Sequence, residues 1–299
     1  MAVYKRSYKP YEGRLTPDWS RFLAPARYSL ETLFQSRLLI GFMVASYIVP
    51  IFAATVIYLH HNLSALTLLR INPDNLLPID GDFFGAFLSF QGALAFILTA
   101  YAGPGLISPD LSNNALPLYL CRPINRTEYI LGKMAVLFIP LSFMTWIPGL
   151  ALFAIQAGLQ GQGWGWDHIH FAWAIFAGSW VWIVLLALLA VALSAWVRWK
   201  LAASALLFGI FFISSAMGAM VNEVLTTRAG NVLSLGYVIG IIWANMLRLS
   251  TNKTLFGEMF DIRRGDEIPQ YMAWLVLGVV CAACIGLLNR RLRAKEVVS

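Results

Sequence analysis

The feature of this 299-residue sequence that most limits its fold is a series of long apolar runs separated by short polar segments. An α-helix needs about 20 apolar residues to cross the ~30 Å hydrocarbon layer of a bilayer. Six runs are of about that length: 38–59, 83–107, 134–158, 169–196, 201–222 and 270–288. Because a spanning segment must satisfy its own backbone polar groups, we expect an all-α polytopic membrane protein with six transmembrane helices.

The composition supports this class. Only 12% of the residues are charged, whereas soluble domains carry about 25%. A net charge of +7 would indicate a nucleic-acid partner in a soluble protein, but here it fits loop charge that orients the chain in a bilayer, so we expect no nucleic acid. The three cysteines, Cys121, Cys281 and Cys284, give no disulfide framework.

The distribution of Lys and Arg predicts the orientation. With a cytoplasmic N-terminus, the inner side receives seven of these residues in 1–37, three in 106–133, two in 197–200 and four in 289–299, against six outside. We therefore expect both termini in the cytoplasm. The predicted parts are an N-terminal tail (1–37), a six-helix transmembrane domain (38–288) and a basic tail (289–299).

A seventh apolar stretch, 232–249, lies in the predicted outer loop 223–269. If it crossed the membrane, the basic C-terminal tail would be outside. It is short, contains two glycines, and is polar at Asn245 and Arg248. We expect a re-entrant outer segment before the last helix, with a true span as the alternative.

Residues 17–37 predict an amphipathic helix on the membrane surface, because aromatic and aliphatic residues there alternate with arginines. Asp18 is a candidate N-cap, and Pro25 is expected to bend the helix or delay its start.

The six predicted spans contain no Asp, Glu, Lys or Arg. This counts against a secondary transporter or a proton-relay pump, which normally keeps an ionisable group in the membrane. Polar side chains inside the spans are the candidate substrate path, and we name Gln91, Thr99, Thr145, Ser214 and Ser215.

No nucleotide-binding motif is recognisable. Gly132-Lys133 is followed by Met134 rather than the Ser or Thr of a phosphate-binding loop, and Thr127 stands where its first Gly belongs. We expect no ATP, other cofactor or metal on this chain and no catalytic residue in it.

The polar segment 106–133, between the second and third spans, carries most of the sequence-level specificity. Ser108 or Asp110 is expected to cap a short helix whose apolar face holds Leu111, Ala115, Leu118 and Tyr119. Pro123 forces a turn after Arg122. Thr127 is expected to cap the next helix, with Glu128 in its first turn. Such a projection can enter a groove on a cytosolic partner.

This segment resembles the type-2 permease subunits of ATP-binding-cassette exporters, through the pattern L-x-LYL-x-RP-I-x-R-x-EY-x-x-GK. The resemblance is strongest over about 100–150. It implies a coupling helix that seats in a cleft of a cytosolic ATPase subunit, which binds ATP and Mg²⁺. It also implies a second permease copy, or a similar chain, in the cytoplasmic (inner) membrane of a bacterium. The expected ATPase contacts are Asp110, Leu111, Asn114, Leu118, Tyr119, Arg122, Pro123, Arg126, Glu128, Tyr129 and Lys133.

The expected function is movement of an amphipathic or lipid-like substrate, driven by the partner ATPase. One alternative is a membrane-embedded enzyme that modifies lipids, using His60, His61, His168 and His170 or the 223–269 loop; those histidines would then not tolerate alanine. The other alternative is a non-transporting scaffold, which predicts a partner without ATPase activity.

Overall fold

The structure is a computed structural model that describes residues 20, 23–62, 64, 66, 78–113, 115, 125–161, 163–197, 199–225, 229–249 and 268–293. All regular elements in these residues are helical. Six of the resulting segments are long and apolar enough to cross a membrane: Arg37–His60, Gly81–Ser112, Arg126–Gln160, Ile169–Trp196, Lys200–Val224 and Gln270–Arg291. The predicted all-α fold with six such helices is confirmed.

Three of the six segments are interrupted. The first consists of α2 (Arg37–Ser46) and α3 (Ile48–His60), the second of α5 (Gly81–Ala102), the 3₁₀ turn η3 (Gly103–Gly105) and α6 (Ser108–Ser112), and the third of α8 (Arg126–Met144) and α9 (Trp146–Gln160). The remaining three are α11 (Ile169–Trp196), α12 (Lys200–Leu225) and α15 (Gln270–Arg293). The shorter elements are α1 (Leu23–Phe34), α10 (Trp164–Asp167), η4 (Ala229–Leu233) and α13 (Leu235–Leu247).

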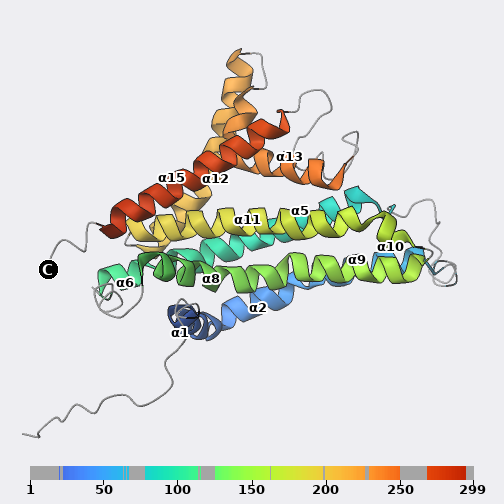
Figure 1. The fold of residues 1–299 in the computed structure, drawn as a ribbon, viewed down its shortest axis with the longest axis horizontal. Coiled ribbons are helices and arrows are strands. Elements are labelled where there is room, and N and C mark those ends of the chain that lie inside the picture. Colours follow the sequence, from blue (N-terminus) through green and yellow to red (C-terminus); the bar gives the residue numbers. More distant parts are fainter. Residues whose placement is uncertain are drawn as a thin grey trace, which may run out of the picture.

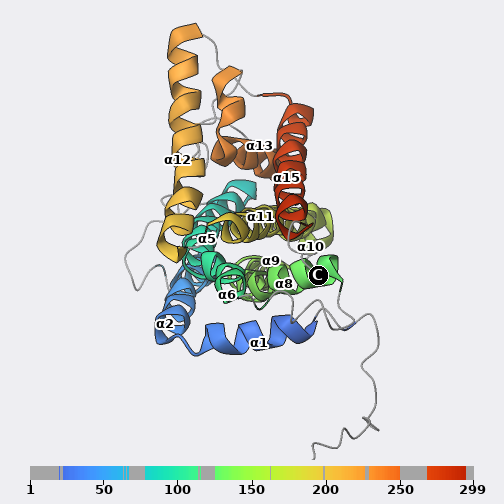
Figure 2. The same ribbon diagram turned by 90° about the vertical axis from the view of Figure 1, so that its left-hand side faces the viewer.

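Helix α11 is the centre of the bundle. It packs against α5, α8, α9, α12, α13 and α15, and it is the most buried of the six candidate spans. Helix α12 is the least buried; its first part packs beside α5, and its later part projects beyond α11 (Figure 2). Helix α12 exposes many apolar side chains, among them Phe212, Ile213 and Met220.

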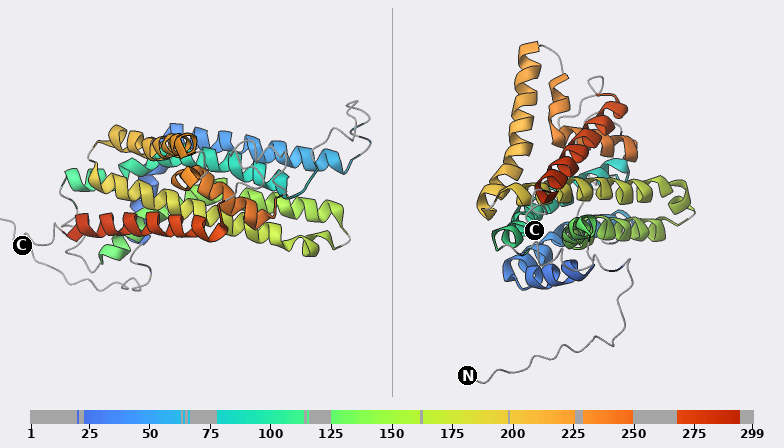
Figure 3. Two further views of the ribbon diagram at one scale, coloured as in Figure 1. Left: turned by 90° about the horizontal axis from the view of Figure 1, so that it is seen from above. Right: turned by 60° about the vertical axis from the view of Figure 1, so that its left-hand side comes forward.

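The two ends of the bundle carry different segments. Helix α6, the start of α8 and the end of α15 lie together at one end, whereas α10 and the end of α9 lie at the other (Figures 1 and 3). The two ends of segment 106–133 therefore lie close to the C-terminal end of the last helix.

The break between α2 and α3 explains one buried polar residue. Pro50 has no backbone N–H, so the carbonyl of Ser46, four residues earlier, lacks its usual intrahelical donor. The side-chain amide of Gln91, on α5, donates to this carbonyl at 3.1 Å. Gln91 is fully buried, and its side-chain amide satisfies the Ser46 carbonyl that has no donor because of Pro50.

Helix α1 is shorter than the amphipathic helix predicted over 17–37. It begins at Leu23, with Pro25 in its first turn where the missing N–H costs nothing, and the chain leaves it before Ser36, which caps α2. The predicted cap Asp18 lies outside the described residues. In Figure 1 α1 is seen almost end-on below α8, so it lies across the bundle axis, as expected of a helix on a membrane surface.

Helix α13 corresponds to the seventh apolar stretch. Its 13 residues are about 20 Å long, too short to cross the hydrocarbon layer. It is buried against α11 and α15, which shelters a short helix of this kind. This agrees with the predicted re-entrant segment rather than with a seventh span.

A close approach of η3 to α11 yields a first prediction. A Cβ atom placed on Gly103 would lie 2.5 Å from the Cβ of Ala190, whereas one placed on Gly105 would meet nothing closer than 3.8 Å. We expect Gly103→Ala to lower the free energy of unfolding by about 2 kcal/mol, because this contact must open. Gly105→Ala is the matched control and should change it by less than about 0.5 kcal/mol. Unfolding of both variants in mixed micelles makes the comparison, and equal stability would show that η3 does not pack tightly on α11.

Candidate functional site

The structure describes both ends of segment 106–133, through Asn113 and Ala115 on one side and from Asn125 on the other. Five of the predicted partner contacts lie outside the described residues: Asn114, Leu118, Tyr119, Arg122 and Pro123. The site is therefore built from the two ends of the segment and from what holds them.

The first end is fixed to α11 by one side chain. The hydroxyl of Ser194 accepts hydrogen bonds from the backbone N–H groups of Ile107 and Ser108, at 2.9 and 3.0 Å, and donates to the carbonyl of Pro104 at 2.8 Å. Ser194 is fully buried. These bonds satisfy backbone groups of the turn between η3 and α6, so Ser194 fixes where α6 starts.

The start of α6 differs from the prediction. Ser108 or Asp110 was expected to cap it, but Ile107 occupies the cap position, Ser108 is the first helical residue, and Pro109 follows in the first turn. A side-chain cap is not needed there, because Ser194 of a different helix already accepts from the first two N–H groups.

At the second end of the segment, the N-cap of the helix lies two residues earlier than predicted. Thr127 was expected to cap this helix, but the N-cap is Asn125 and α8 starts at Arg126. The backbone N–H of Asn125 donates to the carboxylate of Glu128 at 2.9 Å, which is the return bond of a capping box. The sequence does contain the capping-box pattern, Asn125 followed three residues later by Glu128. Thr127 is also a common N-cap residue, so the pattern alone did not decide between them.

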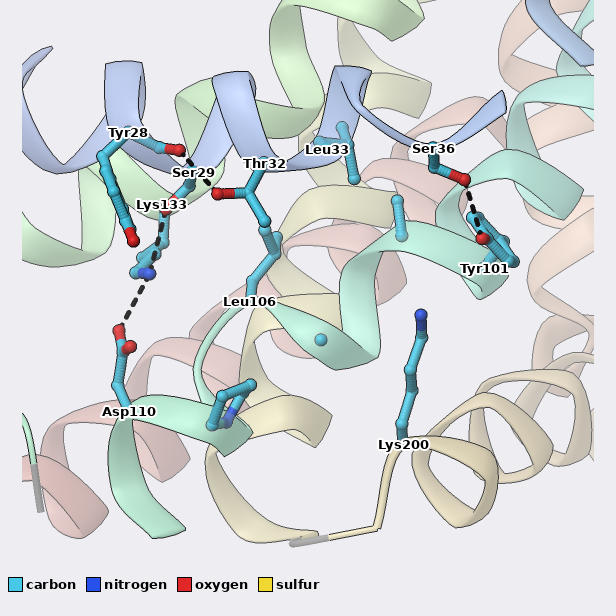
Figure 4. A pocket seen from close by; sticks show the side chains of 13 residues that line it. Tyr28, Ser29, Thr32, Leu33, Ser36, Tyr101, Leu106, Asp110, Lys133 and Lys200 are labelled. Atoms are coloured by element: carbon cyan, nitrogen blue, oxygen red, sulfur yellow. Dashed lines mark hydrogen bonds and ion pairs between the residues drawn. The ribbon is translucent and has the colours of Figure 1, made fainter. Parts of the chain in front are cut away.

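The two ends meet at Asp110 of α6. Its Oδ2 atom lies 2.8 Å from the ammonium group of Lys133 and accepts a hydrogen bond of 2.7 Å from the hydroxyl of Tyr129. Lys133 also donates to the hydroxyl of Ser29 on α1 at 3.1 Å. We call Ser29, Asp110, Tyr129 and Lys133 the hinge cluster; Figure 4 shows Lys133 between Ser29 and Asp110.

Burial makes the hinge cluster strong. The side chain of Lys133 is 5% exposed and that of Asp110 17% exposed, and Tyr129 is buried. This ion pair is largely shielded from water, and removal of one partner would leave the other charge poorly solvated. By contrast, the Arg27–Glu31 pair of α1 is 85% and 60% exposed and contributes little. The hinge cluster therefore joins α1, α6 and α8 into one unit.

The third segment is longer than a bilayer crossing requires. The 35 residues of Arg126–Gln160 measure about 52 Å along the helix axis, well beyond the ~30 Å hydrocarbon layer. The first turns of α8 can therefore project beyond that layer and carry Lys133 outside it. This preserves the predicted span 134–158 with no ionisable residue inside.

Several residues of the site were not predicted. Ser29 and Ser194 hold the two ends of the segment, and the pocket beside the hinge cluster is lined by Ser36, Tyr101 and Lys200 as well (Figure 4). Ser36 and Tyr101 are joined by a hydroxyl–hydroxyl hydrogen bond of 3.1 Å. None of these residues belongs to a local motif, so no signal in the segment itself pointed to them.

The predicted partner contacts within the described residues are of two kinds. Leu111, Tyr129 and Lys133 are buried, so in this chain they hold the segment in place and do not present a free surface. Arg126 and Glu128 are partly exposed on the first turn of α8.

The structure does not bring the candidate substrate-path residues together at one cavity. The hydroxyls of Thr99 and Thr145 donate to carbonyls of their own helices, at Ala95 and Leu141. Ser215 pairs with Ser234, Ser214 bonds to Phe211, and Gln91 bonds to Ser46 as described above. The role of these five residues in a substrate path stays a prediction.

The four histidines of the enzyme alternative lie near the opposite end of the bundle. His61 bonds to the carbonyl of Ile57 at 3.1 Å and to the side chain of Gln160 at 2.8 Å. His168 stacks on the ring of Trp164, with centroids 4.4 Å apart. Among the described residues, no three His, Cys, Asp or Glu side chains are grouped so that they could hold a metal ion.

The described chain is thus an all-helical, multi-pass membrane protein by the length and apolar character of its helices. Comparison with protein-family models and with curated protein sequences finds no match.

Proposed function

We propose that this chain is the membrane-spanning permease subunit of an ATP-driven exporter, which couples ATP hydrolysis by a cytosolic ATP-binding-cassette partner to movement of a substrate. ATP and Mg²⁺ would bind to that partner, and a second copy of this chain or a similar chain would complete the transporter. The observation that carries the proposal is the hinge cluster, which ties both ends of segment 106–133 to α1 and to the spans.

The hinge cluster supports a coupling role because it connects the helices that a partner would have to move together. A partner that pushes on the middle of the segment would act on α6 and α8 together, since Asp110 connects them through Lys133 and Tyr129. Helix α8 continues into the third span, and Ser194 connects the start of α6 to the central helix α11. Movement at the segment would therefore reach three spans and α1 together.

An apolar pocket supports a lipid-like substrate. It has a volume of about 350 Å³, and Phe96, Trp182, Phe211 and Trp243 line it from α5, α11, α12 and α13. The indole N–H groups of both tryptophans donate to backbone carbonyls, of Gly92 and Gly178, each at 3.0 Å. The rings therefore offer the pocket apolar faces, which suit an acyl chain better than a free ion.

The proposal requires that segment 106–133 face the cytoplasm, and labelling tests this. In a chain with its three cysteines replaced by Ala, we would introduce Ser112→Cys at the end of α6 and His60→Cys at the opposite end of the bundle. Both positions are exposed. A membrane-impermeant maleimide should label His60→Cys in intact cells and Ser112→Cys only after permeabilisation. Labelling of Ser112→Cys in intact cells would place the segment outside and remove its access to a cytosolic ATPase.

A further inference from the structure

We propose that the pocket between α1, the α5–α6 turn and the start of α12 binds a phosphate group, supplied by the headgroup of an anionic phospholipid, with Lys200 as the cation that recognises it. This inference depends on the membrane location of the chain and not on the proposed transport function.

The pocket is polar on one side and positively charged. It has a volume of about 300 Å³ and is lined by the hydroxyl groups of Ser29 and Thr32 on α1, of Ser36 at the N-cap of α2 and of Tyr101 on α5. The Ser29 hydroxyl accepts from Lys133 and keeps its own O–H to donate to a phosphate oxygen, and the Ser36–Tyr101 pair keeps one O–H between them. Figure 4 shows these side chains above the pocket and Lys200 reaching up from below, with its ammonium group toward the space between them.

The charges around the pocket leave one cation in excess. Asp110 and Lys133 also line it, but they neutralise each other at 2.8 Å. The ammonium group of Lys200 lies 4.6 Å from the ring centroid of Tyr101, and no carboxylate of the described residues lies within 4.0 Å of it. The Tyr101 ring orients Lys200 but does not neutralise it. An anion bound in the pocket would neutralise it.

The position of Lys200 in its helix supports the same conclusion. It is the first residue of α12, a helix of 26 residues. A positive charge at a helix N-terminus is unfavourable, because the helix dipole is positive there. The same dipole and the free N–H groups of the first turn attract an anion. A phosphate bound at the ammonium group of Lys200 would offset the unfavourable position of this positive charge.

The location of the pocket favours a lipid as the source of the phosphate. The 22 residues of α5 are about 33 Å long, close to the hydrocarbon thickness, and the pocket lies at the end of this helix. Helix α1 forms one wall and exposes Leu23, Tyr28 and Phe34, side chains suited to the bilayer surface. Basic pockets between helices at the cytoplasmic face are sites for anionic headgroups.

The test is native mass spectrometry of the delipidated full-length chain, titrated with dioleoyl phosphatidylglycerol, with dioleoyl phosphatidylcholine or with inorganic phosphate. Phosphatidylglycerol should bind more tightly than phosphatidylcholine, and Lys200→Gln should weaken it about fivefold or more. The matched control is Arg290→Gln, which removes the same charge from an exposed site outside the pocket and should change binding less than twofold. Equal loss in the two variants would overturn the proposal.

A second variant blocks the pocket without removing a charge. Thr32 is exposed and its hydroxyl bonds only to the Tyr28 carbonyl of its own helix, so Thr32→Phe should fold normally and fill the space. Thr32→Phe should abolish the tighter binding of phosphatidylglycerol relative to phosphatidylcholine. If the variant binds phosphatidylglycerol as tightly as the native chain does, the lipid does not bind in this pocket. If inorganic phosphate displaces the lipid at equal concentration, the pocket binds a free anion and the lipid assignment is wrong.

Discussion

Lys133→Met is expected to lower the free energy of unfolding by about 2 kcal/mol, because it leaves the partly buried carboxylate of Asp110 without its cation. Methionine keeps most of the length and volume of the lysine side chain, so the loss would come from charge and hydrogen bonds rather than from a cavity. Unfolding in mixed micelles, followed by tryptophan fluorescence, measures the change.

Two controls separate this effect from a general loss of surface charge. Arg27→Met breaks the exposed pair that Arg27 forms with Glu31 within α1. It should lower the free energy of unfolding by less than about 0.5 kcal/mol. The double variant Asp110→Asn/Lys133→Met removes both charges and should recover most of the stability, since no uncompensated charge remains. A Lys133→Met chain as stable as the Arg27→Met chain would contradict a buried hinge cluster.

Ser194→Ala is expected to cost about 3 kcal/mol. The change leaves the N–H groups of Ile107 and Ser108 without their shared acceptor and the carbonyl of Pro104 without its donor, in a site that water does not reach. The matched control is Ser89→Ala. Ser89 is equally buried, but its hydroxyl donates only to the carbonyl of Gly85 in its own helix, so the loss there should stay below about 1 kcal/mol.

The two serine variants are compared by thermal unfolding in one detergent. Similar midpoints for both would mean that the turn between η3 and α6 does not depend on Ser194. Hydrogen exchange at Ile107 and Ser108 gives a second measurement, because their amide protons should exchange faster only in Ser194→Ala.

The fold class could be predicted because one physical requirement dominates this sequence. A backbone in hydrocarbon must bond to itself, so each apolar run of about 20 residues predicts a helix without knowledge of its neighbours. The position of the basic C-terminal tail and the short length of 232–249 favoured a re-entrant segment over a span, and α13 is too short to cross. The predicted helix ends were less accurate. Asn125 and Thr127 are both good N-cap residues, and the sequence pattern alone does not show which of them caps α8.

The site could be predicted only in part, because its contacts are long-range. The segment 106–133 was found from its own motif, and Asp110, Tyr129 and Lys133 were all named from it. Their partner Ser29 lies 104 residues from Lys133, and Ser194 lies 87 residues from Ile107. Neither residue is unusual in its local sequence, so only packing of the helices brings them to the segment. Gln91 was named as a substrate contact because it is a polar residue in a span, and its bond to the Ser46 carbonyl is a further task that its local sequence did not indicate.

The most direct test of the permease assignment is to extract the tagged chain under gentle conditions and assay the co-purified material for ATP hydrolysis, with Arg122→Ala/Tyr119→Ala as the comparison. Arg290→Ala, which removes a charge from the last helix, is the control. The account predicts that an ATPase co-purifies with the native chain and with Arg290→Ala, and that the loop variant loses it or loses its stimulation by substrate. An intact membrane preparation in which no ATPase accompanies the native chain would contradict the account.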